Sequence, residues 1–554
     1  MGAAPRPVNP SIPAAWLLPA ALFALPLLAA LACGLGEALD AAAWHALLAE
    51  PAWAPATALS LWVGGASTAL SLALTLWLVP RLHGTRAWSA LQRALGAMLA
   101  VPHAAFAVGL ALLVMPSGLL ARLVAAPLGW AAPPDVATVH DPAGLALIAA
   151  LVLKEVPFLL WTVVASWRRA GQQAVAERQL QIAATMGYGA VRAWWRVLWP
   201  QWLPRLALPV AAVWAYGLTV VDMALVLGPT TPPTLAVLAW QWLLDAEPAR
   251  NAMGAAAALL LAGLTAAGAA AAVALWRAAA PWRRARQVRG DRGAARAGHG
   301  AMPLAGAVAG VYAGVLAMLA GASVATIWTF PSLWPQQASA EAWATVAQRL
   351  DTLGLTAALA LASAASGVAL AVAWLETTPP GWDARAAVLV FLPLLVPGVL
   401  LVAGLYRVTL ALGTDGRFAG LWLAHTLYTA PYALIALAPA WRSLDPRYAQ
   451  TAHALGRSHA AFLLRVKWPM LLAPLASAAA VGFAVSVTQY LSTQFVGAGR
   501  YATLTTEALT LAAGGQRPLL AAFALLQAAL PAAVFALALA LARRQARRTG
   551  GEAA

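Results

Sequence analysis

The segment QIAATMGYGAVRAWWRVLWP occupies residues 181–200, and the segment QTAHALGRSHAAFLLRVKWP occupies residues 450–469. The two segments align without a gap, 269 positions apart. Identical residues at equivalent positions include a glutamine, an alanine, a glycine, a valine and a final Trp-Pro pair. A match of this length at one spacing predicts an internal duplication. The chain is therefore predicted to consist of two related halves.

The composition is that of an integral membrane protein. Hydrophobic residues make up 62% of the 554 positions and charged residues only 10%, whereas roughly a quarter of a soluble chain is charged. Apolar stretches such as residues 59–79, 255–276, 353–375 and 519–541 exceed the ~18 residues that indicate a spanning helix. About twelve such stretches are predicted. The predicted fold class is all-α integral membrane, with two homologous halves of about six spans each.

The net charge of +16 is explained by membrane topology. With the N-terminus inside, the cytoplasmic loops hold most of the Lys and Arg, and the outer loops hold more acidic than basic residues. This bias predicts a multi-pass protein of the bacterial inner (plasma) membrane with both termini in the cytoplasm, and no nucleic-acid partner. Contact with anionic membrane lipid is expected at the basic linker and tail, at Arg283, Arg284, Arg286, Arg289, Arg292, Arg296, Arg543, Arg544, Arg547 and Arg548.

Each matching segment predicts two short helices that meet at a glycine. In the first copy Ala183 and Ala184 continue a helix, and Gly187 allows a sharp turn. A second, amphipathic helix is expected from Ala190 until Pro200 breaks it. Its apolar face consists of Val191, Trp194, Trp195, Leu198 and Trp202. Such a helix could serve only as a lipid anchor, but two copies on one side of the membrane favour docking of two identical partner subunits.

The two segments resemble the EAA loops of binding-protein-dependent ABC importer permeases of type I, whose pattern is E-A-A, three residues, G, nine residues, I, one residue, L, P. This spacing is retained in both copies. A fused pair of such permease cores resembles the group that includes the ferric-iron, thiamine and Ynj-type permeases, and segments such as LKEVPFLLW resemble the Ynj type most closely. The resemblance implies that the loops bind two copies of an ATP-binding subunit through Gln181, Ala183, Ala184, Gly187, Val197, Pro200, Gln450, Ala452, Gly456, Val466 and Pro469.

The copies depart from the family pattern at one polar position. Gln181 and Gln450 stand where the family commonly has glutamate, so hydrogen bonding is kept and an ionic contact is lost. The resemblance implies a permease subunit that forms the translocation pathway for a small solute, thiamine-like, metal or other, delivered by a periplasmic binding protein. No phosphate loop G-x-x-x-x-G-K-[ST] occurs. The chain is therefore expected not to be an enzyme, to bind no cofactor or metal, to have no catalytic residues, and to leave ATP to its partner subunits.

The predicted organisation follows the duplication. It comprises an N-terminal end with the first span and outer loop (residues 1–56), the first permease domain (57–276), a basic cytoplasmic linker (277–303), an extra span with its outer loop (304–348), the second permease domain (349–542) and a basic cytoplasmic tail (543–554).

A few polar residues fall inside predicted spans. Lys154 and Glu155 lie near the middle of the fourth span, where an ionisable group costs several kcal/mol by most estimates. Either they pair with neighbouring helices or they are polar elements of the solute path. Asp222 in the fifth span and Gln489 in the loosely corresponding place are expected to line that path, unless they only bond to a neighbouring helix. His103 is expected to be an interior histidine at a kink rather than a metal ligand.

Two alternatives to an ATP-driven permease follow from the span count. A secondary active transporter of six plus six spans would use an ion gradient, but its usual Gly/Asp/Arg-rich loop between the second and third spans is missing here. A membrane enzyme or scaffold has no supporting motif. The outer loops at residues 228–234 and 496–505 are candidate seats for a binding protein, and ordinary turns explain them equally well.

Overall fold

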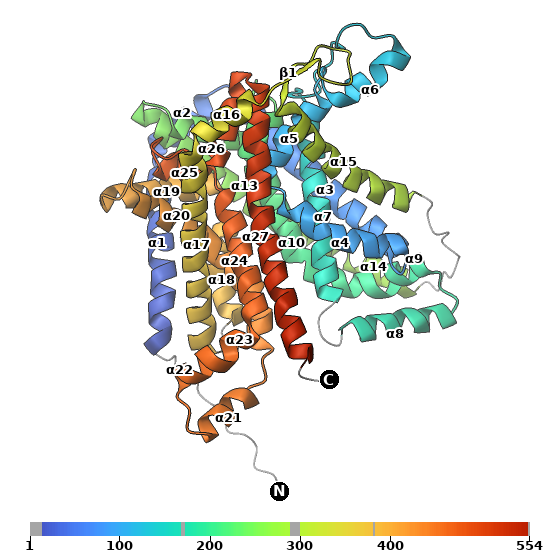
Figure 1. Cartoon of the computed structure of the whole chain (residues 1–554), viewed down its shortest axis with the longest axis vertical. Helices are drawn as coiled ribbons and strands as arrows, with labels where there is room; N and C mark the ends of the chain where they lie inside the picture. Colours follow the sequence, from blue (N-terminus) through green and yellow to red (C-terminus); the bar gives the residue numbers. More distant parts are fainter. Residues whose placement is uncertain (1–13, 168–171, 289–299, 380–382, 552–554) are drawn as a thin grey trace. The chain divides into compact units, whose positions relative to one another are not determined.

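The computed structural model is almost entirely helical (Figure 1). It describes residues 14–167, 172–288, 300–379 and 383–551. Within these ranges the only strands are β1 (Ala325–Ile327) and β2 (Gln337–Ala338), which pair as a short antiparallel hairpin. The predicted all-α membrane fold is confirmed. The predicted lipid-contact residues Arg289, Arg292 and Arg296 lie outside the described residues.

The number of helices that could cross a membrane is close to the predicted count of about twelve. In the described chain nine helices are long and apolar enough to cross a membrane, and two sharply bent helix pairs raise this to 11 if each pair is one span. The predicted fifth span, residues 206–227, is not one helix. Helix α10 (Trp199–Thr219) ends where Val220 turns to extended backbone, and α11 (Asp222–Leu227) begins after Val221. Two adjacent β-branched residues are easily accommodated in such a break.

The chain forms two compact units. We call Leu35–Leu350 with Leu504–Ala528 the first-half unit, and Met1–Gly34 with Asp351–Thr503 and Ala529–Ala554 the second-half unit. Each unit takes most of one sequence half and one or more helices from the other. The predicted domain ranges describe the order of segments along the chain. The contacts show in addition that each unit includes segments from both sequence halves.

The first-half unit contains α2 to α16, both strands, α26 and the beginning of α27. Besides α10 and α11, its helices are α2 Ala41–Ala49, α3 Trp53–Leu82, α4 Arg86–Ala100, α5 His103–Val114, α6 Leu119–Leu128, α7 Leu145–Trp167, α8 Gln172–Thr185, α9 Ala190–Ala193, the π-helical turn η1 Trp194–Leu198, α12 Leu235–Leu243, α13 Pro248–Ala278, α14 Ala280–Val288, α15 Ala301–Ala322, α16 Glu341–Gln348, α26 Leu504–Gly514 and α27 Arg517–Gly551.

Helix α15, the extra span between the sequence halves, packs on α5 of the first-half unit. The ring centroids of Phe106 and Tyr312 are 4.7 Å apart. Gly109 lets the helices approach so closely that a Cβ there would stand 2.6 Å from Cγ1 of Val315. Helix α26 joins the same unit, where the Gln527 amide of α27 donates to the Thr505 hydroxyl at 2.6 Å.

The second-half unit contains α1 and α17 to α25, with the rest of α27. Their bounds are α1 Ala14–Ala38, α17 Leu350–Thr377, α18 Asp383–Leu395, α19 Gly398–Ala411, α20 Phe418–Arg442, α21 Arg447–Ala454, α22 His459–Phe462, the π-helical turn η3 Leu463–Lys467, α23 Trp468–Met470, α24 Leu472–Val487 and α25 Leu491–Val496.

Helix α1, the first span in the chain, packs on α19 of this unit. A Cβ at Gly404 would overlap the carbonyl oxygen of Ala30, and a Cβ at Gly34 would stand 2.9 Å from the carbonyl oxygen of Leu400. Main chain thus meets main chain at this crossing. Small residues at helix crossings are the usual means of close packing in membranes, where no hydrophobic effect drives helices together.

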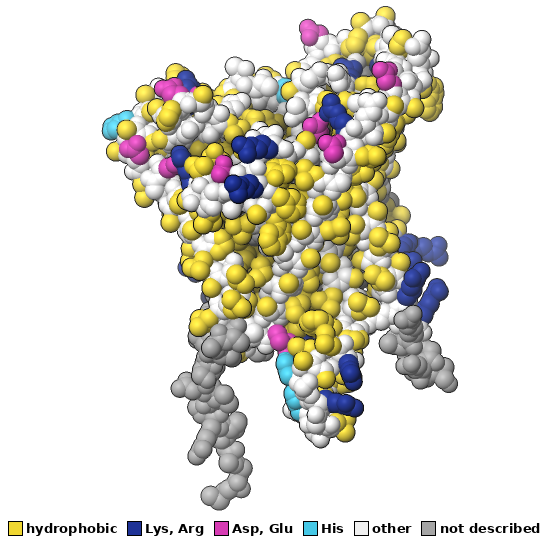
Figure 2. Space-filling model, turned by 60° about the vertical axis from the view of Figure 1, so that its left-hand side comes forward, with side chains coloured by type: hydrophobic (Ala, Val, Ile, Leu, Met, Phe, Trp, Pro, Cys, Tyr) yellow, Lys and Arg dark blue, Asp and Glu magenta, His cyan; other side chains and the backbone are white. Residues whose placement is uncertain are grey.

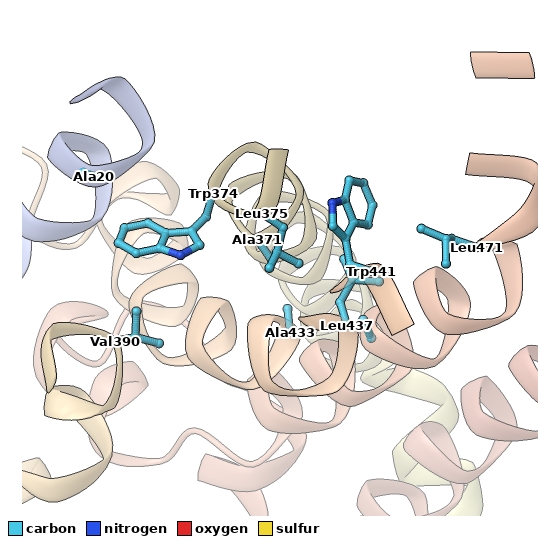
Figure 3. Close-up of a cluster of buried hydrophobic side chains, with 10 residues drawn as sticks. Ala20, Ala371, Trp374, Leu375, Val390, Ala433, Leu437, Trp441 and Leu471 are labelled. Carbon is cyan, nitrogen blue, oxygen red and sulfur yellow. The ribbon is translucent and has the colours of Figure 1, made fainter. Parts of the chain in front are cut away.

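A buried cluster joins α17, α18 and α20 of the second-half unit (Figure 3). Trp374 and Trp441 lie on opposite sides of the end of α17, with Leu375 between them. Leu471, between α23 and α24, extends the cluster toward the second matching segment. On the face drawn in Figure 2, hydrophobic side chains cover a broad middle zone and charged ones gather toward its ends, as expected of helices in contact with hydrocarbon.

We expect Gly404→Ala to destabilise the fold, because the added methyl meets a carbonyl of α1 that cannot rotate away. Overpacking of this kind typically costs about 1–3 kcal/mol. The melting temperature of the detergent-solubilised protein measures the effect. Gly354→Ala is the control, because a Cβ at this helical glycine of the same unit has no heavy atom within 4 Å. Equal melting temperatures for the two variants would contradict the close α1–α19 contact.

Candidate functional site

The first matching segment folds as a helix, a glycine turn and a second helix at one end of the first-half unit (Figure 1). Gly187 follows α8 with φ 85°, in the left-handed region. The amide of Gly187 donates to the carbonyl of Ala184 at 3.0 Å, and the amide of Tyr188 donates to that of Ala183 at 3.0 Å. These two bonds form a Schellman cap, which favours glycine because it has no Cβ.

The second matching segment has the same backbone geometry at one end of the second-half unit. Gly456 follows α21 with φ 70°. Its amide donates to the carbonyl of His453 at 2.9 Å, and the amide of Arg457 donates to that of Ala452 at 3.0 Å. The alanines and glycines that match in sequence therefore hold matching positions in two equal caps.

The correspondence extends well beyond the quoted segments. Six consecutive elements of one half begin 269 positions before their counterparts in the other. The starts are Ala190 and His459, Trp194 and Leu463, Trp199 and Trp468, Asp222 and Leu491, Leu235 and Leu504, and Pro248 and Arg517. In this register Asp222 corresponds to Leu491 rather than to Gln489.

The prolines act differently from the expectation that they end the second helix. The helix runs through Pro200 into α10, and the turn before it widens to a π-turn in which the amide of Trp199 bonds to the carbonyl of Trp194. The turn before Pro469 does the same. A proline ring clashes with the carbonyl four residues earlier in an α-helix, and a widened turn relieves the clash. Proline here shapes the helix instead of stopping it.

The predicted docking residues of the two loops differ in exposure. Ala183 and Ala452 are buried, whereas Gln181, Ala184, Gly187, Gln450 and Gly456 are exposed and Val197 and Val466 are partly exposed. Pro200 is partly exposed and Pro469 is exposed. The apolar residue directly before each glycine is also exposed, Met186 at 53% and Leu455 at 73%. Sequence matching missed this pair because Met and Leu differ, although both are large and apolar.

The first loop is seated on its unit by aromatic packing. The Trp194 side chain is 1% exposed, stacks on Trp167 with 5.5 Å between ring centroids, and packs against Trp199 at 5.2 Å. His83, just after α3, closes the cluster at 4.6 Å from Trp167 and 5.3 Å from Trp194. Except for Trp195, which is 45% exposed, the apolar face predicted for this helix is covered by the protein itself and not by lipid or a partner.

The second loop is seated by charge instead. Glu376, at the end of α17, accepts a bond from Lys467 Nζ at 2.6 Å and lies 3.0 Å from His459 Nε2. Lys467 Nζ also lies 4.3 Å from the centroid of the Trp441 ring. The η3 turn buries no side chain, in contrast to η1. The two loops therefore have matching glycine turns, which we call their tips. The contacts that hold each loop on its unit, which we call its support, differ between the two loops.

Lys154 in α7 donates hydrogen bonds to main-chain carbonyls at the break between α4 and α5. Its Nζ donates to the carbonyl of Val101 at 2.6 Å and lies 3.4 Å from that of Met98. Pro102 has no amide hydrogen for the Met98 carbonyl, and the following helix begins only at His103, so both carbonyls lack helical donors. A cation at the C-terminal end of α4 is also favoured by the helix dipole.

Asp222 and Gln489 lie at other helix breaks, whereas Glu155 lies within α7. Asp222 is the first residue of α11, and the Tyr216 hydroxyl lies 3.5 Å from its carboxylate. Gln489 precedes α25 and accepts a bond from the Ser492 hydroxyl at 3.1 Å. Glu155, next to Lys154, is 7% exposed. Asp222 and Gln489 thus lie where helices are interrupted, and pathway lining by any of the three residues stays a prediction.

The His103 ring packs at a tilt against that of Tyr216, with 4.9 Å between ring centroids. Among the described residues, no group of three or more His, Cys, Asp or Glu side chains could hold a metal ion.

Comparison with known proteins identifies the family. The chain is 34% identical over 535 residues to the inner membrane ABC transporter permease protein YnjC of Escherichia coli (strain K12), an alignment that covers 95% of this chain and 96% of that protein. The chain belongs to the ABC transporter permeases. A shorter match, 24% identical over 156 residues, covers 28% of this permease and 61% of the spermidine/putrescine transport system permease protein PotC of Haemophilus influenzae. No family model and no solved structure matched.

Family membership confirms the resemblance to Ynj-type fused permeases. The permease is a multi-pass inner-membrane protein, a transporter subunit rather than a catalytic enzyme, and its family implies partnership with ATP-binding subunits. The secondary-transporter and membrane-enzyme alternatives are set aside on the same ground.

We expect His83 to make the first loop support sensitive to acid. Burial among the tryptophans lowers the pKa of His83, with the nearby Glu177 opposing the shift. A histidine with a lowered pKa in the fold binds its proton more readily when unfolded, so its contribution to stability is lost as pH falls below the ordinary value. The melting temperature should therefore drop less between about pH 7.5 and about pH 5.5 in His83→Phe than in the native protein.

The control for this experiment is His45→Gln, because His45 is exposed on α2 of the same unit. It should leave the acid-induced drop in melting temperature unchanged. An identical drop in native protein and His83→Phe would contradict a role for His83.

We expect Lys154→Met to destabilise the protein, because the Val101 and Met98 carbonyls lose their donor while the length of the side chain is kept. A buried polar group without a partner costs about 1–3 kcal/mol. Thermal unfolding in detergent measures the loss, and Lys154→Gln, which retains an amide donor, should lose less. An unchanged melting temperature together with lost transport would instead favour the pathway role for Lys154.

Proposed function

We propose that this permease is the membrane subunit of a binding-protein-dependent ABC importer and that each matching loop receives one ATP-binding subunit. The observation that carries the proposal is the pair of equal helix–glycine–helix tips, 269 positions apart, in a chain whose family works with ATP-binding subunits. Two equal tips suit two copies of one partner, because each copy then meets the same surface.

The exposed faces of the tips support docking by shape and apolar contact. Met186 and Leu455 stand exposed beside the capped glycines, and Ile182 adds a second exposed apolar side chain in the first loop, at 55%. Gln181 and Gln450 are exposed as well and offer hydrogen bonds without charge. Exposed apolar side chains close to amide groups are typical of a surface that binds another protein.

The chain path supports a coupling role for the loops. The first docking helix passes through η1 into α10, which is followed by the break at Asp222. The second passes through η3 and bends by 76° at Leu471 into α24, which is followed by the break at Gln489. A movement of either tip on ATP binding would be transmitted along this path to the helix break at Asp222 or at Gln489. The mechanism that we propose is alternating access, in which such movements open the pathway to one side of the membrane at a time.

The cargo is a small solute, thiamine-like, metal or other, that a periplasmic binding protein delivers from the outer side of the membrane. This part of the proposal rests on the resemblance to binding-protein-dependent importers and on the charge bias, which favours both termini in the cytoplasm. ATP is bound and hydrolysed by the partner subunits, and the permease binds no cofactor of its own.

We expect Gly456→Val to weaken docking, because a β-branched residue in the left-handed region costs about 1–2 kcal/mol and reshapes the tip. The readout is the amount of ATP-binding subunit that co-purifies with the full chain, and the ATP-driven uptake of the complex in proteoliposomes. Gly456→Asn is the matched control, since asparagine tolerates this conformation. Full co-purification and uptake with Gly456→Val would argue against the loop as a docking element.

We expect Glu376→Gln to loosen only the second loop, because Lys467 and His459 lose their common carboxylate. Hydrogen bonds to charged groups contribute about 1.5–3 kcal/mol. Limited proteolysis should then cleave faster near residues 447–470 and at an unchanged rate near residues 172–200. Glu341→Gln, at an exposed position on α16 of the other unit, should change neither rate. Faster cleavage at both loops would contradict separate supports.

A further inference from the structure

Helix α6 and strand β1 lie at the end of the first-half unit opposite α8 and α9 (Figure 1). A cavity of about 260 Å³ lies beside them. Its walls include the apolar side chains of Leu112, Met115 and Met318 and two arginines, Arg122 of α6 and Arg517 of α27. No acidic residue is among the residues that line it. At ~30 Å³ per liquid water molecule the space would hold roughly nine waters, enough for a phosphate ester group.

Arg122 brings a positive charge to this cavity, and its Cζ lies 4.9 Å from the ring centroid of Trp328 and 5.7 Å from that of Phe330. The residue is 4% exposed. Its guanidinium donates to four main-chain carbonyls, those of Ser117 at 2.8 Å, Trp328 at 2.9 Å, Thr329 at 2.8 Å and Ser332 at 2.6 Å. Carbonyls are neutral, so these bonds orient the guanidinium and leave its charge in place. An arginine has five N–H donors, and one therefore remains for a ligand.

Membrane topology does not explain the two arginines. Other arginines of the first-half unit lie beside carboxylates: Arg349 lies 2.8 Å from Glu507, and Arg250 lies 3.8 Å from both Asp245 and Glu247. Two like charges around one space without an acid repel each other. An anion between them removes that cost.

The surroundings of the cavity place it at a bilayer surface. Helix α6, which carries the buried Arg122, exposes Leu120, Leu123, Val124 and Leu128 on its other side, between 41% and 58%. Trp334, in the loop between the strands, is 82% exposed. A short helix with one apolar face and an exposed tryptophan nearby is typical of the interface between headgroups and acyl chains.

We propose that this cavity binds the phosphate of an anionic phospholipid, with Arg122 and Arg517 as its cationic partners and the apolar wall of Leu112, Met115 and Met318 along the first part of an acyl chain. A free phosphate ion has the same charge chemistry but would leave the apolar wall without a partner. The site does not depend on the docking role of the loops.

The test is native mass spectrometry of the full chain in detergent, titrated with phosphatidylglycerol, with phosphatidylcholine or with inorganic phosphate. Native protein should bind one phosphatidylglycerol more tightly than phosphatidylcholine. Arg517→Gln should bind it roughly fivefold more weakly, whereas Arg517→Lys should stay within about twofold of native protein. Arg517 is exposed, so its variants are expected to fold, and their melting temperatures check this.

Arg250→Gln is the matched control, because it removes an arginine of the same unit whose charge is already neutralised. It should bind phosphatidylglycerol like native protein. Equal affinity of native protein and Arg517→Gln, or an equal loss in Arg250→Gln, would overturn the site. Binding of inorganic phosphate at least as tight as that of phosphatidylglycerol, or no preference over phosphatidylcholine, would overturn the assignment to a lipid.

Discussion

Both loops depend on one backbone constraint, a glycine in the left-handed region that closes one helix and starts the next. With Gly187 at φ 85° and Gly456 at φ 70°, the chain reverses within a single residue and leaves the apolar neighbour exposed at the tip. The buried alanine that accepts the long Schellman bond lies four residues before each glycine. The spacing of alanine and glycine in the sequence is thus the spacing of a helix cap.

The two loop tips have the same backbone geometry, but different contacts hold each loop on its unit. Four tryptophans and a histidine hold the first loop, while one glutamate between a lysine and a histidine holds the second. Aromatic packing is insensitive to salt, whereas a partly exposed ion pair weakens with ionic strength and with the charge of its histidine. A fused permease can in this way offer one surface to two identical partners while each half responds to conditions by its own chemistry.

Much of the architecture could be predicted from the sequence because membrane burial and duplication leave strong patterns. The apolar stretches gave the all-α class, and the matched Ala183–Gly187 spacing gave the turn. The broken fifth span could not be seen, because Val220 and Val221 are as apolar as their neighbours and a break changes backbone direction without changing composition. The role of Lys154 was equally hidden, since its partners are carbonyls freed by Pro102, 52 positions earlier in the chain. The exchange of α1 and α15 between units depends on contacts that have no sequence signature.

The number of ATP-binding subunits held by one chain tests the central claim most directly. The complex would be isolated through a tag on the permease, and its intact mass measured by native mass spectrometry. The account predicts one permease with two ATP-binding subunits, and one such subunit after the tip of either loop is disabled. A complex with a single ATP-binding subunit in the native protein, or with two that survive loss of a loop tip, would contradict it.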